Sequence, residues 1–350
     1  KAFDKAGLSY PSTEKGSPSF TKLFLSEHPH ELAKLIVQAR NLNKIQGTFI
    51  DSILRYVSKD GRIHSHINQV RSDDGGTVSG RISANNPNLQ QIPARDPELG
   101  PMIRRLFLPE EGQQWAAIDY SQQEPRILTH YAHAFGNYRK MDMGGVEEFI
   151  TEYKENPDAD FHSMVADLAG LPRKTAKTIN LALMYGMGVN KLSQQLDIPL
   201  EEAKDLTKQY HQKVPFVKQL TQGVQRYLDD ARSGGCIRSI RGRKCRFNLY
   251  EPDTFEMTKA MPYDEAVNAY GPTTKLKRAY TYKALNRLIQ PCETGKIPLL
   301  QVHDELAFSV ADADEAKGLA KMMEEAVPLE VPNKCDIDLG PNWGDAKEIK

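Results

Sequence analysis

The sequence has no excess of charge of either sign, since 46 Lys and Arg residues balance 46 Asp and Glu residues over 350 positions. Net charge therefore neither favours nor excludes a polyanionic partner. No apolar run approaches the length needed to span a bilayer, and the first residues do not form a charged and then apolar secretory leader. We expect no membrane partner.

Cysteine is scarce as well. The four cysteines, at positions 236, 245, 292 and 335, form no CxxC pair and have no spacing suited to zinc. They are typical of reduced thiols, so we expect an intracellular, cytoplasmic protein. A glycine-rich phosphate loop of the GxxxxGK[ST] type is also missing. The chain opens on Lys1 rather than Met, and we expect it to be a fragment or a processed product.

The pattern of apolar residues predicts an α+β protein. A length of 350 residues exceeds what one compact core usually fills, so two or three subdomains are expected. Helical patterns lie at 31–50 and through most of 136–235, where KTAKTINLALMYG is the clearest unit. Strand-like runs lie at 115–119 and in the last third of the chain. Strands on both sides of a long helical insertion predict a sheet assembled from distant segments.

The segment LLQVHDELAFSV, at 299–310, resembles two strands around a polar crease. His303, Asp304 and Glu305 interrupt the apolar residues. Two adjacent carboxylates in a dry setting repel each other and resist ionising together. A surface turn with a bound divalent cation would stabilise both charges. A solvated turn with two acids is the alternative.

A second carboxylate ends the apolar run WAAID, where Asp119 follows Ile118. Two strands that end in carboxylates can lie side by side in one sheet and share a metal site. Oxygen ligands without nearby His or Cys favour Mg²⁺. Two such ions can bind the attacking and leaving oxygens of an in-line nucleotidyl transfer. An ordinary strand-end acid is the alternative for Asp119.

The segment LPRKTAKTINLALMYG predicts a helix with Pro172 in its first turn. Arg173, Lys177, Leu181 and Tyr185 recur every four residues and therefore lie along one face. The order of cation, apolar residue and aromatic ring matches the phosphates, sugar and base of a nucleoside triphosphate. The alternative is a helix whose basic first turn is exposed to solvent and whose later apolar residues pack into the core.

At this point the sequence resembles a known family. DYSQQEPR, RKTAKTINLALMYG and LLQVHDEL are similar to motifs A, B and C of the DNA polymerase I family (family A). SGRISANNPNLQQIP resembles that family's template–primer loop, TYKALNRLIQ the start of its late palm helix, and NWGDAKE its C-terminal ending. DYSQQEP and TYKALNRLIQ are more similar to phage-type members. The resemblance runs along the whole chain, with the motifs in the family's order.

The resemblance implies a right-hand polymerase fold with a partial thumb at 1–54, palm at 55–135 and 284–350, and fingers at 136–283. It implies an enzyme that adds dNTPs to the primer 3′-hydroxyl of a primer–template DNA and releases pyrophosphate. A metal-dependent nuclease and a non-catalytic DNA-binding fragment are the alternatives. If the chain is encoded by a phage, its location would be the host cytoplasm. A processivity factor is a possible partner that leaves no sign in the sequence.

The resemblance also assigns roles to residues of the reaction centre. Asp119 and Asp304 would hold two Mg²⁺ ions together with the Tyr120 carbonyl. Catalysis would involve Asp119, Asp304, Glu305 and Lys177. Contacts with the incoming nucleotide would come from Arg173, Lys177, His162, Leu181, Tyr185, Glu124 and Gln122. Within that set, Glu124 resembles the steric gate against ribonucleotides, and Tyr185 with Gly186 would lie where the templating base enters.

DNA contacts are implied for Arg81, Asn88, Gln90, Arg241, Arg243, Asn286, Gln290 and His303. The minor groove suits an enzyme that must accept every sequence, because A·T and G·C pairs share acceptors there. Arg241 and Arg243 lie within 232–246, which holds six basic residues and no acid. Such a run suits phosphate binding. Taken alone, a solvated loop is the alternative.

The sequence departs from the family pattern in two places. Fourteen positions separate Gln290 from Asp304, too few for a helix and a return strand, and the family's usual small-residue run is missing there. We expect an omitted segment rather than a true shortening. The start of the chain matches only the latter part of a thumb, and within the 350 residues we find no acidic motif of a proofreading exonuclease.

Overall fold

The computed structural model describes residues 1–13, 15–69, 75–77, 81–93, 96, 99–240, 242, 244–254, 259–279 and 298–349. The chain divides into two compact units, Lys1–Ile67 with Ala84–Leu106, and Asn68–Ser83 with Phe107–Lys350. Within the described ranges, no helix has both the length and the apolar character needed to cross a membrane. The limits of thumb, palm and fingers at 54, 135 and 283 stay a prediction.

The first unit is mainly helical. The helix predicted at 31–50 is confirmed as α3 (Glu31–Ile45), which continues through the π-helical turn η1 (Gln46–Ile50) into α4 (Asp51–Tyr56). Its small core contains Phe3, whose ring centroid lies 5.0 Å from that of Phe20. The remaining helices are α1 (Ala2–Lys5), α2 (Lys22–Glu27), the 3₁₀ turn η2 (Leu89–Gln91) and α5 (Leu99–Arg104). Strands β1 (His66–Asn68) and β2 (Ser83–Asn85) form a two-stranded sheet.

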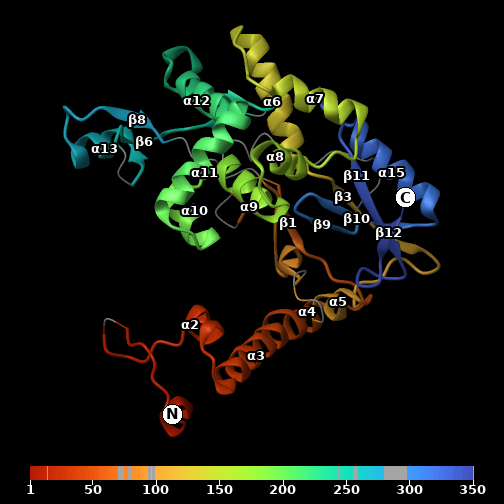
Figure 1. The fold of residues 1–350 in the computed structure, drawn as a ribbon. Coiled ribbons are helices and arrows are strands. Elements are labelled where there is room, and N and C mark those ends of the chain that lie inside the picture. Colours follow the sequence, from red (N-terminus) through yellow and green to blue (C-terminus); the bar gives the residue numbers. More distant parts are fainter. Residues whose placement is uncertain are drawn as a thin grey trace. The chain divides into compact units, whose positions relative to one another are not determined.

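The second unit contains a five-stranded sheet with the order β12-β11-β3-β10-β9. Its members are β3 (Gln114–Tyr120), β9 (Leu300–Val302), β10 (Glu305–Val310), β11 (Cys335–Gly340) and β12 (Lys347–Ile349). All neighbouring strands are antiparallel. Figure 1 shows the blue C-terminal strands on both sides of β3, so the prediction of a sheet assembled from distant segments is confirmed.

One face of this sheet is covered by α15 (Ala313–Glu325). On β3, Ala116, Ile118 and Tyr120 are buried in the core that Leu319 and Met323 of α15 complete. Side chains alternate between the two faces of a strand. The intervening Asp119 therefore lies on the face opposite α15.

The predicted helical stretch is confirmed as a layer of seven consecutive helices: α6 (Gln123–Arg139), α7 (Val146–Glu155), α8 (Phe161–Ala169), α9 (Arg173–Met184), α10 (Val189–Leu196), α11 (Leu200–Lys213) and α12 (Pro215–Asp229). Its core contains Phe149, whose ring centroid lies 5.0 Å from that of Phe161 and 5.4 Å from that of Phe216. The same core includes Val165 of α8 and Ile179 of α9, and these two helices pack against each other.

Small elements follow α12. The 3₁₀ turn η3 (Ala231–Ser233) leads into a hairpin of β4 (Cys236–Arg238) and β5 (Lys244–Arg246). Strand β6 (Leu249–Pro252) pairs with β7 (Met261–Pro262) and with β8 (Leu276–Arg278), and α13 (Tyr263–Tyr270) packs against this small sheet.

Candidate active site

Strand register brings three carboxylates into one row across the sheet. Asp119 of β3 is opposite Glu305 of β10 on one side and Asp336 of β11 on the other. Asp304 is adjacent to Glu305 in the turn between β9 and β10. We call Asp336, Asp119, Glu305 and Asp304 the acid row. It confirms that the two predicted strand-end acids meet at one place.

Like charges lie close together in the acid row. Desolvation of the carboxyl group by the surrounding protein raises the pKa of Asp119 to about 8, and the charges of Asp304, Glu305 and Asp336 add to this effect. The Asp119 side chain still has solvent contact, so an ion can reach it. Burial also raises the pKa of Asp304, with a contribution from Glu124. Neighbouring carboxylates oppose each other's ionisation unless a cation binds between them.

The turn that carries Asp304 has two residues, His303 and Asp304. His303 has a positive φ of 58°, which is unusual for a residue other than glycine and holds the chain in a tight reversal. The Gln301 side-chain amide donates a hydrogen bond of 2.5 Å to the His303 carbonyl. The imidazole of His303 is exposed, and its contact with DNA stays a prediction.

Helix α9 presents a cationic end and an aromatic end. The sequence predicts Pro172 in the first turn, but Pro172 is the N-cap, directly before Arg173. A proline fits there, since its missing N–H would have no partner inside the helix. Arg173 and Lys177 are exposed while Leu181 and Tyr185 are half-buried, so the predicted face is the outer face of α9. We call Arg173 and Lys177 the cation face.

The end of α9 is fixed by glycine. Gly186 has a φ of +64°, its N–H donates to the Leu183 carbonyl, and the Met187 N–H donates to the Ala182 carbonyl. This pair of bonds is the Schellman arrangement, which terminates a helix at a residue with positive φ. The chain therefore turns away directly after Tyr185.

Two side chains of α8 and its cap hold the cation face. Asp160 caps α8 by accepting a bond from the Ser163 N–H, and it also accepts a 2.6 Å bond from Arg173 Nε. Burial opposes ionisation of Asp160, but the bonds from Arg173 and Ser163 hold its pKa below the usual value. Arg173 is thus ion-paired although 57% of its side chain is exposed.

His162 is 6% exposed and contacts Asn180 of α9, whose Nδ2 lies 2.9 Å from His162 Nδ1. Because an amide nitrogen only donates, Nδ1 accepts and the neutral ring carries its proton on Nε2. Burial lowers the pKa of His162, and Lys177 and Arg173 lower it further against the opposing effect of Asp160. The ring is therefore neutral at pH 7.

Glu124, in the first turn of α6, connects the acid row with the end of α9. Its carboxylate accepts a 2.6 Å bond from the Tyr185 hydroxyl and lies 3.5 Å from the Arg81 guanidinium. Burial and this hydrogen bond raise the pKa of Tyr185, so the hydroxyl stays protonated and donates. The same carboxylate contributes to the raised pKa of Asp119 and of Asp304.

Gln122 has a structural use that the sequence did not reveal. It adopts a φ of +52° between β3 and α6, donates to the Ala159 carbonyl and accepts from the Phe161 N–H. Its amide thus joins the end of β3 to the start of α8. The predicted nucleotide contact of Gln122 stays a prediction, with both ends of the amide already engaged.

Tyr120 is buried, and its hydroxyl donates a 2.8 Å bond to the Met323 carbonyl of α15. Nearby, the buried guanidinium of Arg126 donates to the carbonyls of Ser121, Pro157 and Pro332, at 2.6–3.0 Å. Three loops around the acid row are thereby held by one cation. The role of the Tyr120 carbonyl as a metal ligand stays a prediction.

The predicted DNA contacts are dispersed. Asn88 caps η2 by accepting a bond from the Gln90 N–H, and both residues belong to the first unit. Arg81 belongs to the second unit and is adjacent to Glu124. Arg241, Arg243, Asn286 and Gln290 lie outside the described residues, as does most of the interval between Gln290 and Asp304.

Sequence reasoning missed Asp336, Asp160 and Asn180. Asp336 stands in CDIDL, whose pattern predicts a strand but does not show which strand it pairs with, although its acids alternate with apolar residues. Asp160 stands directly before α8 and three residues before Ser163, whose N–H it accepts, and this spacing is a recognisable N-cap signal. Asn180 is a buried polar residue of α9. The sequence shows it within the apolar run INLAL, and a polar residue in such a run is a recognisable signal.

The donor set of the acid row fits magnesium. Among the described side chains, no three or more of the types His, Cys, Asp and Glu are grouped so as to hold a metal ion by themselves. Mg²⁺ usually binds through one or two carboxylates together with waters and substrate phosphates, rather than in a cage of protein ligands. Asp119 and Asp304, with oxygen ligands and excess negative charge, satisfy that requirement.

The chain is similar to known proteins along almost its whole length. The family model described as DNA polymerase family A matches residues 2–345. A DNA-directed DNA polymerase of Pseudomonas phage M6 is 34% identical over 403 residues, which covers 98% of this chain and 56% of that protein. The thermostable DNA polymerase I of Thermus aquaticus is 33% identical over 371 residues, which covers 99% of this chain and 41% of that protein.

A solved structure is also similar: the POL domain of Pol1 from M. smegmatis in complex with DNA primer-template and dNTP. The TM-score is 0.68 at 26% identity, over 97% of this chain and 58% of that chain. The chain spans about half the length of these relatives. The predicted α+β polymerase fold is confirmed, and the chain belongs to DNA polymerase family A.

Proposed function

We propose that the chain is the polymerase region of a template-directed DNA polymerase, which adds dNTPs to a primer 3′-hydroxyl and releases pyrophosphate. The observation that carries this proposal is the 2.6 Å contact between Tyr185 and Glu124. It joins the end of α9 to Glu124, whose charge acts on Asp119 and Asp304 of the acid row. A triphosphate lying along α9 would then have its phosphates beside Arg173 and Lys177 and its base beside Tyr185, and its α-phosphate would face the acid row.

In this proposal Asp119 and Asp304 would hold Mg²⁺, with the Tyr120 carbonyl as a further ligand. Two such ions, when bound, would supply charge neutralisation for the attacking and leaving oxygens. Asp119, with its pKa of about 8, must release its proton to act as a ligand at neutral pH. Glu305 and Asp336 add negative potential that favours a cation in the row.

The cation face would bind the triphosphate. Lys177 contributes a point charge, whereas the Arg173 guanidinium can bind two phosphate oxygens at once. Arg173 would exchange the Asp160 carboxylate for phosphate, and His162 offers an Nε2–H donor without adding charge. Fixed positive groups that face developing negative charge are usually the largest contribution in phosphoryl transfer.

The Glu124–Tyr185 pair would form the wall beside the sugar. Glu124 is held from two sides by Tyr185 and Arg81, so its position is fixed before a nucleotide arrives. A carboxylate in the volume of a 2′-hydroxyl would exclude ribonucleotides by its size.

A primer-extension assay with Mg²⁺, dNTPs and a 5′-labelled primer tests the proposal against its alternatives. Longer products are expected. Shorter products would instead indicate a metal-dependent nuclease, and a mobility shift without any change in primer length would indicate a DNA-binding fragment without catalysis.

A further inference from the structure

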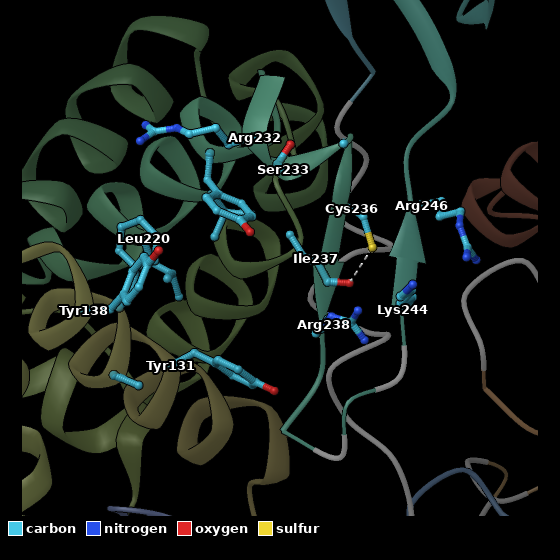
Figure 2. A pocket seen from close by; sticks show the side chains of 15 residues that line it. Tyr131, Tyr138, Leu220, Arg232, Ser233, Cys236, Ile237, Arg238, Lys244 and Arg246 are labelled. Carbon is cyan, nitrogen blue, oxygen red and sulfur yellow. Dashed lines mark hydrogen bonds between the residues drawn. The ribbon is translucent and has the colours of Figure 1, made fainter. Parts of the chain in front are cut away.

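A cavity of about 690 Å³ lies between α6, the end of α12 and the β4–β5 hairpin, outside the site described above (Figure 2). Its volume is in the usual range for ligand sites. Its lining includes four aromatic rings and four basic side chains, and no acid: Tyr131, Phe135, Tyr138, Tyr227, Arg232, Arg238, Lys244 and Arg246. We call it the aromatic–basic pocket.

The helical wall of the pocket is aromatic. Tyr131, Phe135 and Tyr138 are spaced by four and three residues, which places them on one face of α6. Phe135 packs so closely against Gly223 of α12 that a Cβ atom there would clash with the ring. Tyr138 is 71% exposed, so its ring is accessible to a ligand. Figure 2 shows the labelled tyrosines on the helix side of the cavity.

The opposite wall is the basic face of the hairpin. Arg238 is opposite Lys244 in the strand register, and Cys236 is opposite Arg246, whereas Cys245 is buried on the other face. Like charges directly opposite each other destabilise a pair of strands. Among the residues that the structure describes, no carboxylate lies within ion-pair distance of Lys244 or Arg246. A bound anion would relieve this repulsion.

We propose that the aromatic–basic pocket binds single-stranded nucleic acid, with an unpaired base stacked on Tyr138 and the backbone phosphates near Lys244 and Arg246. Aromatic rings combined with a positive groove are the chemistry by which proteins hold single strands without sequence preference. A duplex does not present its base faces, so the pocket is selective for unpaired nucleotides. The inference rests on the proposed function, which identifies the strand as the unpaired template.

Helix α6 connects this pocket with the reaction centre. Glu124 lies in its first turn, and a rise of 1.5 Å per residue places Tyr131 about 10 Å and Tyr138 about 20 Å further along the axis. A template strand that passes Tyr185, which is bonded to Glu124, and continues along α6 would reach the pocket within a few nucleotides. Arg232 is already paired with Asp230, so the argument depends on Lys244 and Arg246.

Fluorescence anisotropy without dNTPs tests the proposal on the full chain. Two DNAs with the same duplex are compared, one blunt and one with a ten-nucleotide 5′ overhang of dT. The wild type is expected to bind the overhang DNA more tightly. Tyr138→Ala should reduce that advantage about 5-fold or more, whereas Tyr138→Phe should retain it, because stacking needs only the ring.

Salt dependence separates the phosphate contacts from folding defects. The double variant Lys244→Ala/Arg246→Ala should lower the slope of log K against log salt by roughly 0.7 per lost contact with the single strand. Tyr263→Ala and Lys317→Ala, exposed positions outside the pocket, are the matched controls and should bind both DNAs as the wild type does.

Equal wild-type affinity for the two DNAs would overturn the proposal. So would an equal loss in Tyr138→Phe and Tyr138→Ala, or complete displacement of the overhang by dTTP alone, which would indicate a mononucleotide site. Primer extension is measured in parallel. If the chain prefers the overhang DNA but extends no primer, the proposed function is refuted and the binding role of the pocket is retained. If the chain extends the primer without preferring the overhang DNA, the binding role of the pocket is refuted and the proposed function is retained.

Discussion

The acid row and the cation face are built in opposite ways. The acid row is fixed by hydrogen-bonded strand register, which holds Glu305, Asp119 and Asp336 side by side even though their charges repel. The cation face consists of long exposed side chains on a helix, and only Arg173 has a described carboxylate partner there, in Asp160. A rigid anionic site suits ions that stay through the reaction. Mobile cations suit a ligand that arrives and leaves in each cycle.

The largest expected effect is on the rigid side. Asp304→Ala removes a proposed metal ligand and should lower the rate of extension by about 10³-fold or more, because the lost interaction acts chiefly in the transition state. Primer–template binding should remain. Single-turnover extension and a gel-shift titration measure the two quantities. Asp205→Asn, an exposed acid on α11, is the control. Near wild-type extension by Asp304→Ala with Mg²⁺ as the only metal would exclude the ligand role.

The Glu124–Tyr185 contact joins the two regions and comes next. Glu124→Ala empties the volume beside the sugar and should raise ribonucleotide use relative to dNTP by up to about 10²-fold, the usual limit for rejecting one added hydroxyl. Tyr185→Phe keeps the ring but removes the 2.6 Å bond, so a smaller rise is expected. Competition between rNTP and dNTP in single-turnover kinetics measures both. An unchanged ratio in Glu124→Ala would rule out the gate.

Leu181 tests the apolar part of the α9 face. Leucine has no polar atom to replace the contact of a substrate 3′-hydroxyl, so the wild type should discriminate against ddNTPs. An unmade hydrogen bond in a closed site costs about 1–3 kcal/mol, or about 5- to 150-fold in relative rate. Leu181→Tyr should reduce this discrimination with little change in dNTP use. Termination ladders of the two proteins on one template measure it, and identical ladders would leave Leu181 as a packing residue.

The acid row and the cation face could each be predicted only in part from the sequence. Strand β3, the β9–β10 hairpin and helix α9 were found from local periodicity, and the meeting of Asp119 with the Asp304 turn followed from them. Asp336 was not placed in the site, because the pairing of β11 with β3 joins segments about two hundred residues apart and leaves no local pattern. The ion pair of Arg173 with Asp160 depends on how two helices pack, which periodicity does not specify.

The acid row should also have a measurable effect on stability. A raised pKa means that the native state holds a proton on Asp119 which the unfolded chain, with a pKa near 3.8, has lost. The stabilisation is present below that value and is lost as pH rises through about 8. In EDTA, Asp119→Asn should therefore melt a few degrees above the wild type at pH 9 and close to it at pH 4.

Thermal melts at the two pH values, with Asp205→Asn as the control, measure this effect. Millimolar Mg²⁺ should narrow the difference at pH 9, because a cation neutralises the row in the wild type and lacks its ligand in the variant. A difference in melting temperature that is the same at pH 4 and pH 9 would contradict the electrostatic origin.

The smallest effect is expected on the mobile side. Asp160→Asn keeps a good N-cap for α8 but removes the charge that engages Arg173. An exposed ion pair contributes at most about 1 kcal/mol, so freeing Arg173 should tighten dNTP binding by up to about 5-fold. Steady-state kinetics measure this change as a lower KM for dNTP, with kcat determined in the same experiment. Arg173→Ala in the same background should cancel the gain, and a weaker binding of dNTP by Asp160→Asn would show that the carboxylate positions Arg173 instead.

Strand register also limits how proteins of this kind can change in length. Deleting one residue from β3 would shift every later side chain to the other face and place Asp119 against α15. The connections between elements carry no such restriction. The alignment with the phage M6 polymerase extends over 403 positions although this chain has 350, so that relative carries additional residues. We expect such insertions to lie in the connections, while the strands of the sheet change by substitution alone.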